Sequence, residues 1–225
     1  KQIAEVKNDF ISNITHEFKT PISTIGVALE SMKNFNVLND TKKTKSYIDM
    51  SNNQLTKLNV MVEKLLETAS LDSENLNLKK ERSNITMLIL GLVNKHKLEL
   101  KDKSLTCDGC QDDIYAQIDD FHFENAINNI IDNAIKYGGN KINVTLNQNL
   151  IGFTVTISDN GKTLTKANKD RIFEKFYRIP KGNTHDVKGF GIGLYYSKKI
   201  IEKHGGKIHL VPNSKNTIFK ITLPV

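Results

Sequence analysis

The sequence lacks several features that would assign it to a large class of proteins at once. Its 225 residues include no tryptophan and only two cysteines. No apolar run approaches the roughly 18 residues that a membrane-spanning helix needs, and no signal-peptide stretch follows Lys1. We therefore expect this part of the chain to be soluble and to make no membrane contact. Because it starts without methionine and in mid-pattern, we expect a piece of a longer protein.

The two cysteines, Cys107 and Cys110, enclose Asp108 and Gly109. A structural zinc site needs four ligands, and no second cysteine pair or nearby histidine cluster accompanies them. A thioredoxin-like C-x-x-C motif would open a helix after a strand, whereas Asp-Gly is a turn signal. We expect two ordinary thiols beside a hairpin turn.

Positive charge is in excess, with a formal net charge of +7 and a pI near 9.2. The lysines are scattered, and no basic segment is interleaved with aromatic residues as in many nucleic-acid interfaces. The pattern is typical of a solvated surface, and it also suits a nucleotide or an acidic protein partner. We expect no nucleic-acid partner.

The apolar periodicity divides the chain into two predicted domains, residues 1–72 and 76–225. In the first, apolar residues recur at helical spacing on both sides of a polar break at residues 34–40, which predicts two antiparallel helices. Two helices cannot cover their own apolar stripes. We therefore expect a four-helix bundle formed by dimerisation.

The second domain changes period after Leu76. Strands in adjacent pairs, with helices gathered between them, are typical of a layered α+β domain. A cap at Ser83 is expected for the first helix. The pattern predicts strands at residues 76–79, 104–107, 115–118, 141–147, 153–158, 207–211 and 217–223, and helices at 84–101, 121–137 and 194–204.

Four short motifs stand in order along this second domain. In the first, Asn129, Asn133, Lys136 and Tyr137 recur at three- and four-residue steps and therefore share one helical face. Amide oxygens can complete a Mg²⁺ shell, and a lysine offers a point charge to phosphate. A solvated polar face would give the same pattern.

The second and third motifs are less specific. Asp159 and Gly161 follow a strand pattern, and a carboxylate there can accept a hydrogen bond from an exocyclic amine such as that of adenine. A simple turn is the alternative. The third motif runs from Phe173 to Arg178, preceded by Arg171, and a helix packed in the core would explain it as well.

The fourth motif places Gly189, Gly191 and Gly193 directly before a helix that opens at Leu194. Glycines let the backbone approach phosphate, and a helix N-terminus favours negative charge. The spacing fits neither the dinucleotide fingerprint nor a Walker motif. The order of all four motifs, rather than any one, indicates a nucleotide site.

Residues from about 76 to 225 resemble the catalytic ATP-binding domain of bacterial sensor histidine kinases, relatives of the gyrase-type ATPases. The four motifs look like the N, G1, F and G2 boxes of that family. The resemblance implies a two-layer α/β sandwich that holds ATP and Mg²⁺ under a lid at residues 179–188. The chain departs from the family pattern at Thr163, where a second glycine is usual. The resemblance also implies a role for each site residue. Asn129 and Asn133 would contact the metal and the phosphates, Asp159 would recognise adenine, and Arg171 and Arg178 would neutralise charge during transfer. The residues with other nucleotide contacts would be Lys136, Tyr137, Gly161, Gly189, Gly191, Gly193 and Leu194.

The first helix carries the sequence His16-Glu17-Phe18-Lys19-Thr20-Pro21. A histidine on a helix is more often structural or merely exposed, but His16 lies off the main apolar stripe and Thr20 follows one turn later. Pro21 predicts a bend. The segment looks like the H box of the same kinases. This resemblance makes His16 the phosphoacceptor, Glu17 its base or orienting group, and Thr20 a residue that positions water for dephosphorylation.

The resemblance implies a two-component sensor histidine kinase that works as a homodimer. Such an enzyme phosphorylates His16 with ATP, passes the phosphoryl group to an aspartate of a response-regulator receiver domain, and can act as a phosphatase. It would be the cytoplasmic portion of a bacterial inner-membrane protein. Two interpretations stay open beside it: a gyrase-like ATPase that leaves His16 unused, and a dimeric scaffold with a degenerate nucleotide site, which Thr163 would suit.

Overall fold

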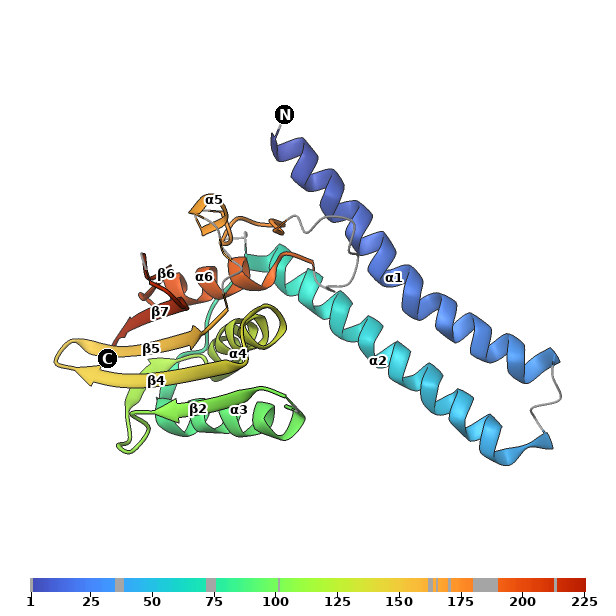
Figure 1. Ribbon diagram of the computed structural model, residues 1–225, viewed down its shortest axis with the longest axis horizontal. Helices are drawn as coiled ribbons and strands as arrows, with labels where there is room; N and C mark the ends of the chain where they lie inside the picture. The colour runs from blue at the N-terminus through green and yellow to red at the C-terminus, as the bar shows by residue number, and fades with distance from the viewer. Residues whose placement is uncertain are drawn as a thin grey trace. The chain divides into compact units, whose positions relative to one another are not determined.

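The computed structural model describes residues 2–34, 39–71, 76–100, 102–161, 164, 166–169, 171–179, 190–212 and 214–225. Contacts divide them into two compact units (Figure 1). One unit holds helices α1 and α2, and the other holds all the strands and helices α3 to α6. Within these described ranges, no helix is both long and apolar enough to cross a membrane.

The first unit is a hairpin of α1 (Gln2–Asn34) and α2 (Thr41–Leu71), and α1 continues unbroken through Pro21. Asp40 caps α2, because its Oδ1 accepts hydrogen bonds from the N–H groups of Lys42 and Lys43, each at 3.1 Å. The Lys43 N–H is the main cause that lowers the pKa of Asp40 below 3.8. The cap fixes where the second helix begins.

Much of the apolar surface of this helical hairpin is exposed. Ala28 and Leu71 are buried, yet many larger apolar side chains are between 41% and 65% exposed. Exposed apolar surface of this extent marks an interaction site. The exposed side chains are Ile11, Ile22, Val27, Leu29, Ile48, Met50, Leu55, Val60, Val62 and Leu66.

The second unit is built on a five-stranded sheet in the order β2-β4-β5-β7-β6, with a separate two-stranded sheet, β1-β3. Only β2 and β4 run parallel; the other neighbours are antiparallel. The strands are β1 (Glu81–Asn84), β2 (Ser104–Asp108), β3 (Tyr115–Ile118), β4 (Lys141–Asn149), β5 (Gly152–Asp159), β6 (Lys207–Leu210) and β7 (Thr217–Pro224).

Helices cover one face of the larger sheet. Burial alternates along β4, where Ile142, Val144 and Leu146 are buried and their neighbours are not, so one face meets the core. The predicted order of a helical hairpin followed by a layered α/β domain is confirmed. The helices are α3 (Ile85–Glu99), α4 (Asp120–Tyr137), α5 (Lys166–Lys169) and α6 (Gly193–Lys203).

The start of this unit differs from the prediction. Residues 76–80 form no strand; the strand is β1, in which Ser83 pairs with Ala116 of β3. Ser83 is therefore not the cap of α3. Asn84 is the cap, and its side chain accepts the Met87 N–H at 3.0 Å. Because β1 has exposed charged residues and buries only Ser83, it carries no apolar alternation that would reveal it.

The prediction of two free thiols beside a hairpin turn is wrong both for the hairpin and for the thiols. Strand β2 pairs with β4 and β3 pairs with β1, so the two strands do not form a hairpin. Cys107 and Cys110 are joined by a disulfide. Gly109 has a φ of 73°, a left-handed conformation that glycine adopts at little cost, and this turn brings the two cysteines together.

A buried polar network ties the start of the unit to its last helix. The Nε2 of His204 accepts the Asp119 N–H at 2.9 Å, and its Nδ1 lies 2.8 Å from the carbonyl of Ile200. Since a carbonyl only accepts and an N–H only donates, the His204 ring is neutral with its proton on Nδ1. Asp119 in turn caps α4 and accepts the Lys79 N–H at 2.8 Å.

This network predicts loss of stability in mild acid. Burial lowers the pKa of His204 below 6.5, so the unfolded chain takes up this proton first. The free energy of unfolding should therefore fall as the pH drops below 6.5, by at most about 1.4 kcal/mol per pH unit from this group. Urea unfolding of the whole chain between pH 5 and 8 (roughly the range in which histidine titrates) measures the slope.

His204→Gln should be less stable but should show a shallower slope, because the titrating ring is gone. His209→Gln is the matched control, since His209 is exposed on β6 and should keep the wild-type slope. Equal slopes in wild type and His204→Gln would mean that another group causes the pH dependence.

Candidate active site

The polar face of α4 forms one wall of the candidate site. The helix is fixed by a buried stripe that includes Phe123, Ile127 and Ile130. Asn129 and Asn133 are half-buried, as is Tyr137, while Lys136 is exposed. Lys136 Nζ donates to Asp132 Oδ2 at 3.3 Å, so the lysine is held close to the helix.

The start of α6 lies directly against this wall. A Cβ placed on Gly193 would be 3.5 Å from the side-chain carbon of Asn129, and Ser197 Oγ donates to the carbonyl of Ala126 at 2.7 Å. The N-cap residue, Ile192, makes no side-chain cap. The positive end of the α6 dipole therefore lies beside the Asn129 amide, and it favours an anion there.

Asp159 ends β5 and is only 4% exposed. Its Oδ1 accepts the Gly161 N–H at 2.7 Å and the Gly139 N–H at 3.2 Å. Glycine is required around it, because a Cβ on Gly138 would lie 2.6 Å from the same oxygen. Two backbone donors thus fix the carboxylate, and a fixed carboxylate suits recognition of one amine.

The third and fourth motifs meet through their backbones. Phe176 has a φ of 70°, which is rare for a residue with a side chain and costs about 1–3 kcal/mol. Its N–H donates to the carbonyl of Gly191 at 2.9 Å, and Gly191 also has a positive φ of 67°. Strain of this kind gathers at functional sites. Gly189 and the predicted lid from residue 180 onward lie outside the described residues, as does Thr163.

The two predicted arginines differ in what the structure shows. Arg171 Nε lies 3.1 Å from Glu174 Oε2, and its guanidinium stacks 4.4 Å from the centre of the Tyr177 ring. Its charge is therefore shared with neighbours of its own motif. Arg178, the last residue of that motif, is half-buried, and Leu194 is half-buried in α6.

The remaining predicted residues lie on α1, in the other unit. His16 and Thr20 are exposed and Glu17 is half-buried. The Thr20 hydroxyl donates to the carbonyl of His16 at 3.3 Å, which places the two residues one turn apart on the same side. An exposed imidazole with a polar neighbour is accessible to a large reactant.

Some residues near the site were missed from the sequence. Lys103 Nζ donates to the carbonyls of Ile135 and Gly138, at the C-terminal end of α4. His96 Nε2 lies 2.8 Å from Asn128 Oδ1 and joins α3 to α4. No pattern marks either residue, because each acts through a contact more than 30 positions away along the chain.

Metal binding rests on the two asparagines. Among the described residues, no group of three or more His, Cys, Asp or Glu could hold a metal ion. Amide oxygens of Asn129 and Asn133 are hard donors that fit Mg²⁺, which is usually bound by few protein ligands together with substrate phosphates and water. The donor set thus fits a metal that arrives with a nucleotide.

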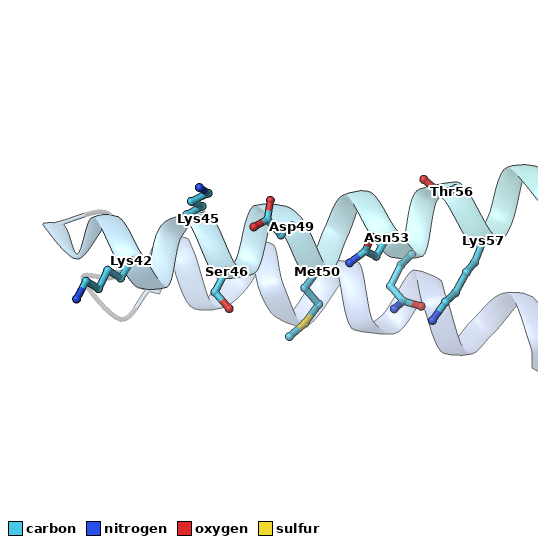
Figure 2. A pocket seen from close by; sticks show the side chains of 9 residues that line it. Lys42, Lys45, Ser46, Asp49, Met50, Asn53, Thr56 and Lys57 are labelled. Carbon is cyan, nitrogen blue, oxygen red and sulfur yellow. The ribbon is translucent and has the colours of Figure 1, made fainter. Parts of the chain in front are cut away.

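A groove along α2 is lined by none of these residues. Figure 2 shows its lining, in which side chains from successive turns project outward from one helix. None of them belongs to the predicted site, and we assign the groove no chemistry. The lining residues are Lys42, Lys45, Ser46, Asp49, Met50, Asn53, Gln54, Thr56 and Lys57.

Comparison with known proteins identifies both units. Residues 6–74 match the His Kinase A (phospho-acceptor) domain, and residues 118–225 match the histidine kinase-, DNA gyrase B- and HSP90-like ATPase. The sensor protein RprX of Bacteroides fragilis is 37% identical over the whole chain, which spans 45% of RprX.

Solved structures share the fold. The histidine kinase AdeS of Acinetobacter baumannii superposes with a TM-score of 0.66 at 21% identity, covering 93% of this chain and 97% of AdeS. The histidine kinase ThkA, solved in complex with the response regulator protein TrrA, gives 0.65 at 24% identity, covering 99% of this chain and 63% of that one. The chain therefore belongs to the sensor histidine kinases of two-component systems, with a phosphoacceptor domain followed by an ATPase domain.

Proposed function

We propose that this chain transfers the γ-phosphoryl group of ATP to His16 and then to an aspartate of a response-regulator receiver domain. The observation that carries the proposal is that one chain holds an exposed histidine, within its match to the phosphoacceptor domain, together with the half-buried Asn129 and the buried Asp159, within its match to the ATPase domain. A gyrase-like ATPase would leave this histidine unused. The complex of ThkA with TrrA supports a response regulator as the partner.

In the proposed reaction, Asp159 accepts a hydrogen bond from the adenine amine. Asn129 and Asn133 would bind Mg²⁺, which would neutralise charge at the phosphates, and the N-terminus of α6 would favour their negative charge. Lys136 and Tyr137 border the same helix face and would contact the nucleotide. Catalysis is then mainly positioning and charge stabilisation, as in other phosphoryl transfers.

A neutral imidazole nitrogen of His16 would attack the γ-phosphorus, and the bond from this phosphorus to the β–γ bridging oxygen would break so that ADP leaves. Glu17, next to it on α1, would orient the ring or accept its proton. Thr20 lies one turn away and would position water when a phosphorylated response regulator is hydrolysed, which gives the phosphatase activity. Arg178 remains a candidate for charge neutralisation, whereas Arg171 must first leave Glu174.

We propose a homodimer as the working form. The exposed apolar side chains of α1 and α2 support it, because a second hairpin would cover them in a four-helix bundle. The functional boundary is proposed between residues 72 and 76, supported by the two compact units and the two family matches. We also propose that the chain is the cytoplasmic portion of a longer, membrane-anchored sensor, since it matches only 45% of RprX.

Incubation of the purified chain with γ-labelled ATP and Mg²⁺ tests the function. The kinase predicts label on the protein that is lost in acid and survives alkali, as expected of a phosphoramidate. Release of free phosphate with no protein label would instead favour the gyrase-like ATPase. Failure to bind nucleotide at all would favour the scaffold.

A further inference from the structure

We propose that Cys107 and Cys110 form a site of thiol–disulfide exchange. The site accepts two electrons from a dithiol reductant, and this reductant carries no negative charge beyond that of its reacting thiolate. The sulfurs of the two residues are bonded to each other. The inference goes beyond the kinase function, because no step proposed above involves either cysteine.

The disulfide lies where a reductant can reach it. Strand β2 is an edge strand of the larger sheet, and both cysteines are half-buried at the margin of the core. Cys107 shares the inward side of β2 with the buried Leu105. Cys110 lies in the connecting loop after the turn, outside any strand, and we assign the attack of an incoming thiolate to its sulfur.

The loop is held in place by contacts that do not involve sulfur. Between the two cysteines, Asn143 Nδ2 donates to Asp108 Oδ2 at 2.6 Å. After Cys110, Thr86 Oγ1 donates to the carbonyl of Asp112 at 2.7 Å, and Asn84 Nδ2 donates to Asp113 Oδ1 at 2.9 Å. Reduction should therefore leave the two thiols as neighbours, and the disulfide can re-form within the chain.

Charge selects the reductant. Asp108, Asp112 and Asp113 are all exposed beside the pair, and the carboxylates of Asp108 and Asp113 accept hydrogen bonds from neutral amides. Their carboxylates repel an approaching thiolate, most strongly when the rest of the reductant is also anionic. Cysteamine, whose ammonium group offsets its thiolate, should react faster than glutathione.

The exchange balances without any other reactant. The thiolate of the dithiol attacks Cys110 Sγ, the S–S bond breaks, and the electron pair leaves on Cys107 Sγ, which takes a proton. The second thiolate of the dithiol then attacks the mixed disulfide and releases Cys110 as a thiol. Two electrons and two protons pass to the protein, and the dithiol becomes a cyclic disulfide.

Alkylation of the whole chain without denaturant tests the site. Protein isolated in air should take up no iodoacetamide, should take up two labels after dithiothreitol, and should lose this reactivity again after oxidised glutathione. Thiols that alkylate freely from the start, or a disulfide that dithiothreitol reduces only in urea, would overturn the proposal. Because no nucleotide is added, failure here would not touch the kinase function.

Single-cysteine variants test the assigned order of attack. The Cys110 thiol in Cys107→Ser should react with iodoacetamide about tenfold faster than the Cys107 thiol in Cys110→Ser, because reactivity follows accessibility. Equal rates, or a faster Cys107, would contradict attack at Cys110.

Asp108→Asn tests the charge selection. In this variant the preference for cysteamine over glutathione should shrink about threefold at low salt, and in the wild type it should shrink likewise as salt screens the carboxylates. Asp102→Asn is the matched control, since Asp102 is exposed at the opposite end of β2 and should keep the preference. A preference that neither Asp108→Asn nor salt reduces would refute the role of charge.

Discussion

Replacing His16 with glutamine is expected to remove all acid-labile phosphate from the chain incubated with ATP and Mg²⁺. Glutamine keeps the polarity and approximate size of histidine but has no ring nitrogen that can form a phosphoramidate. Because His16 is exposed on α1, the substitution should change the free energy of unfolding by less than about 0.5 kcal/mol. Label retained on the protein after alkali treatment is the measurement.

His209→Gln provides the matched control, because this histidine is exposed on β6 and has no proposed role. It should be labelled like the wild type. Nucleotide binding by His16→Gln should be unchanged in calorimetry, which separates loss of the acceptor from loss of the donor site. Normal labelling of His16→Gln would assign the phosphoryl group to another residue and defeat the proposed mechanism.

Replacing Asp159 with asparagine is expected to weaken nucleotide binding roughly 10- to 100-fold, because hydrogen bonds to charged groups contribute about 1.5–3 kcal/mol. Oδ1 already accepts two backbone N–H groups. Asparagine has one acceptor oxygen and one amide donor, so it cannot serve both these N–H groups and the adenine amine. Titration calorimetry with a non-hydrolysable ATP analogue measures the affinity.

The variant should also discriminate less between adenine and guanine nucleotides in competition. Asp120→Asn is the control, since this exposed carboxylate lies at the other end of α4 and should leave affinity unchanged. If Asp159→Asn binds nucleotide normally while it remains folded, the carboxylate does not read adenine.

Periodicity predicted most of the fold because burial on one face repeats along each element. Strand β4 and helix α4 each bury an apolar stripe, and both were predicted within two residues of their observed ends. Strand β1 was not predicted, because its residues are polar and its stability comes from pairing with β3. The cap at Asn84 was missed for a related reason. Ser83 and Asn84 are both good N-cap residues, and the choice between them depends on where the preceding strand ends.

The candidate site was predictable where motifs place side chains on one element. The face shared by Asn129 and Asn133 follows from helix geometry alone. Contacts between elements did not follow from the sequence: the Lys103 bonds to the end of α4 depend on the path of β2, and the pairing of Cys107 with Cys110 depends on the turn at Gly109. Gly138, which caps the C-terminal end of α4, also leaves room for the Asp159 carboxylate.

The backbone bond between Phe176 and Gly191 has a consequence for how this region can vary in length. The bond holds the two residues side by side although they are far apart in the sequence. The entropic cost of joining two such anchored residues grows slowly, by about 0.6 kcal/mol for each doubling of the number of residues between them. A change in the length of the chain between the two residues should therefore cost little free energy as long as this bond is kept.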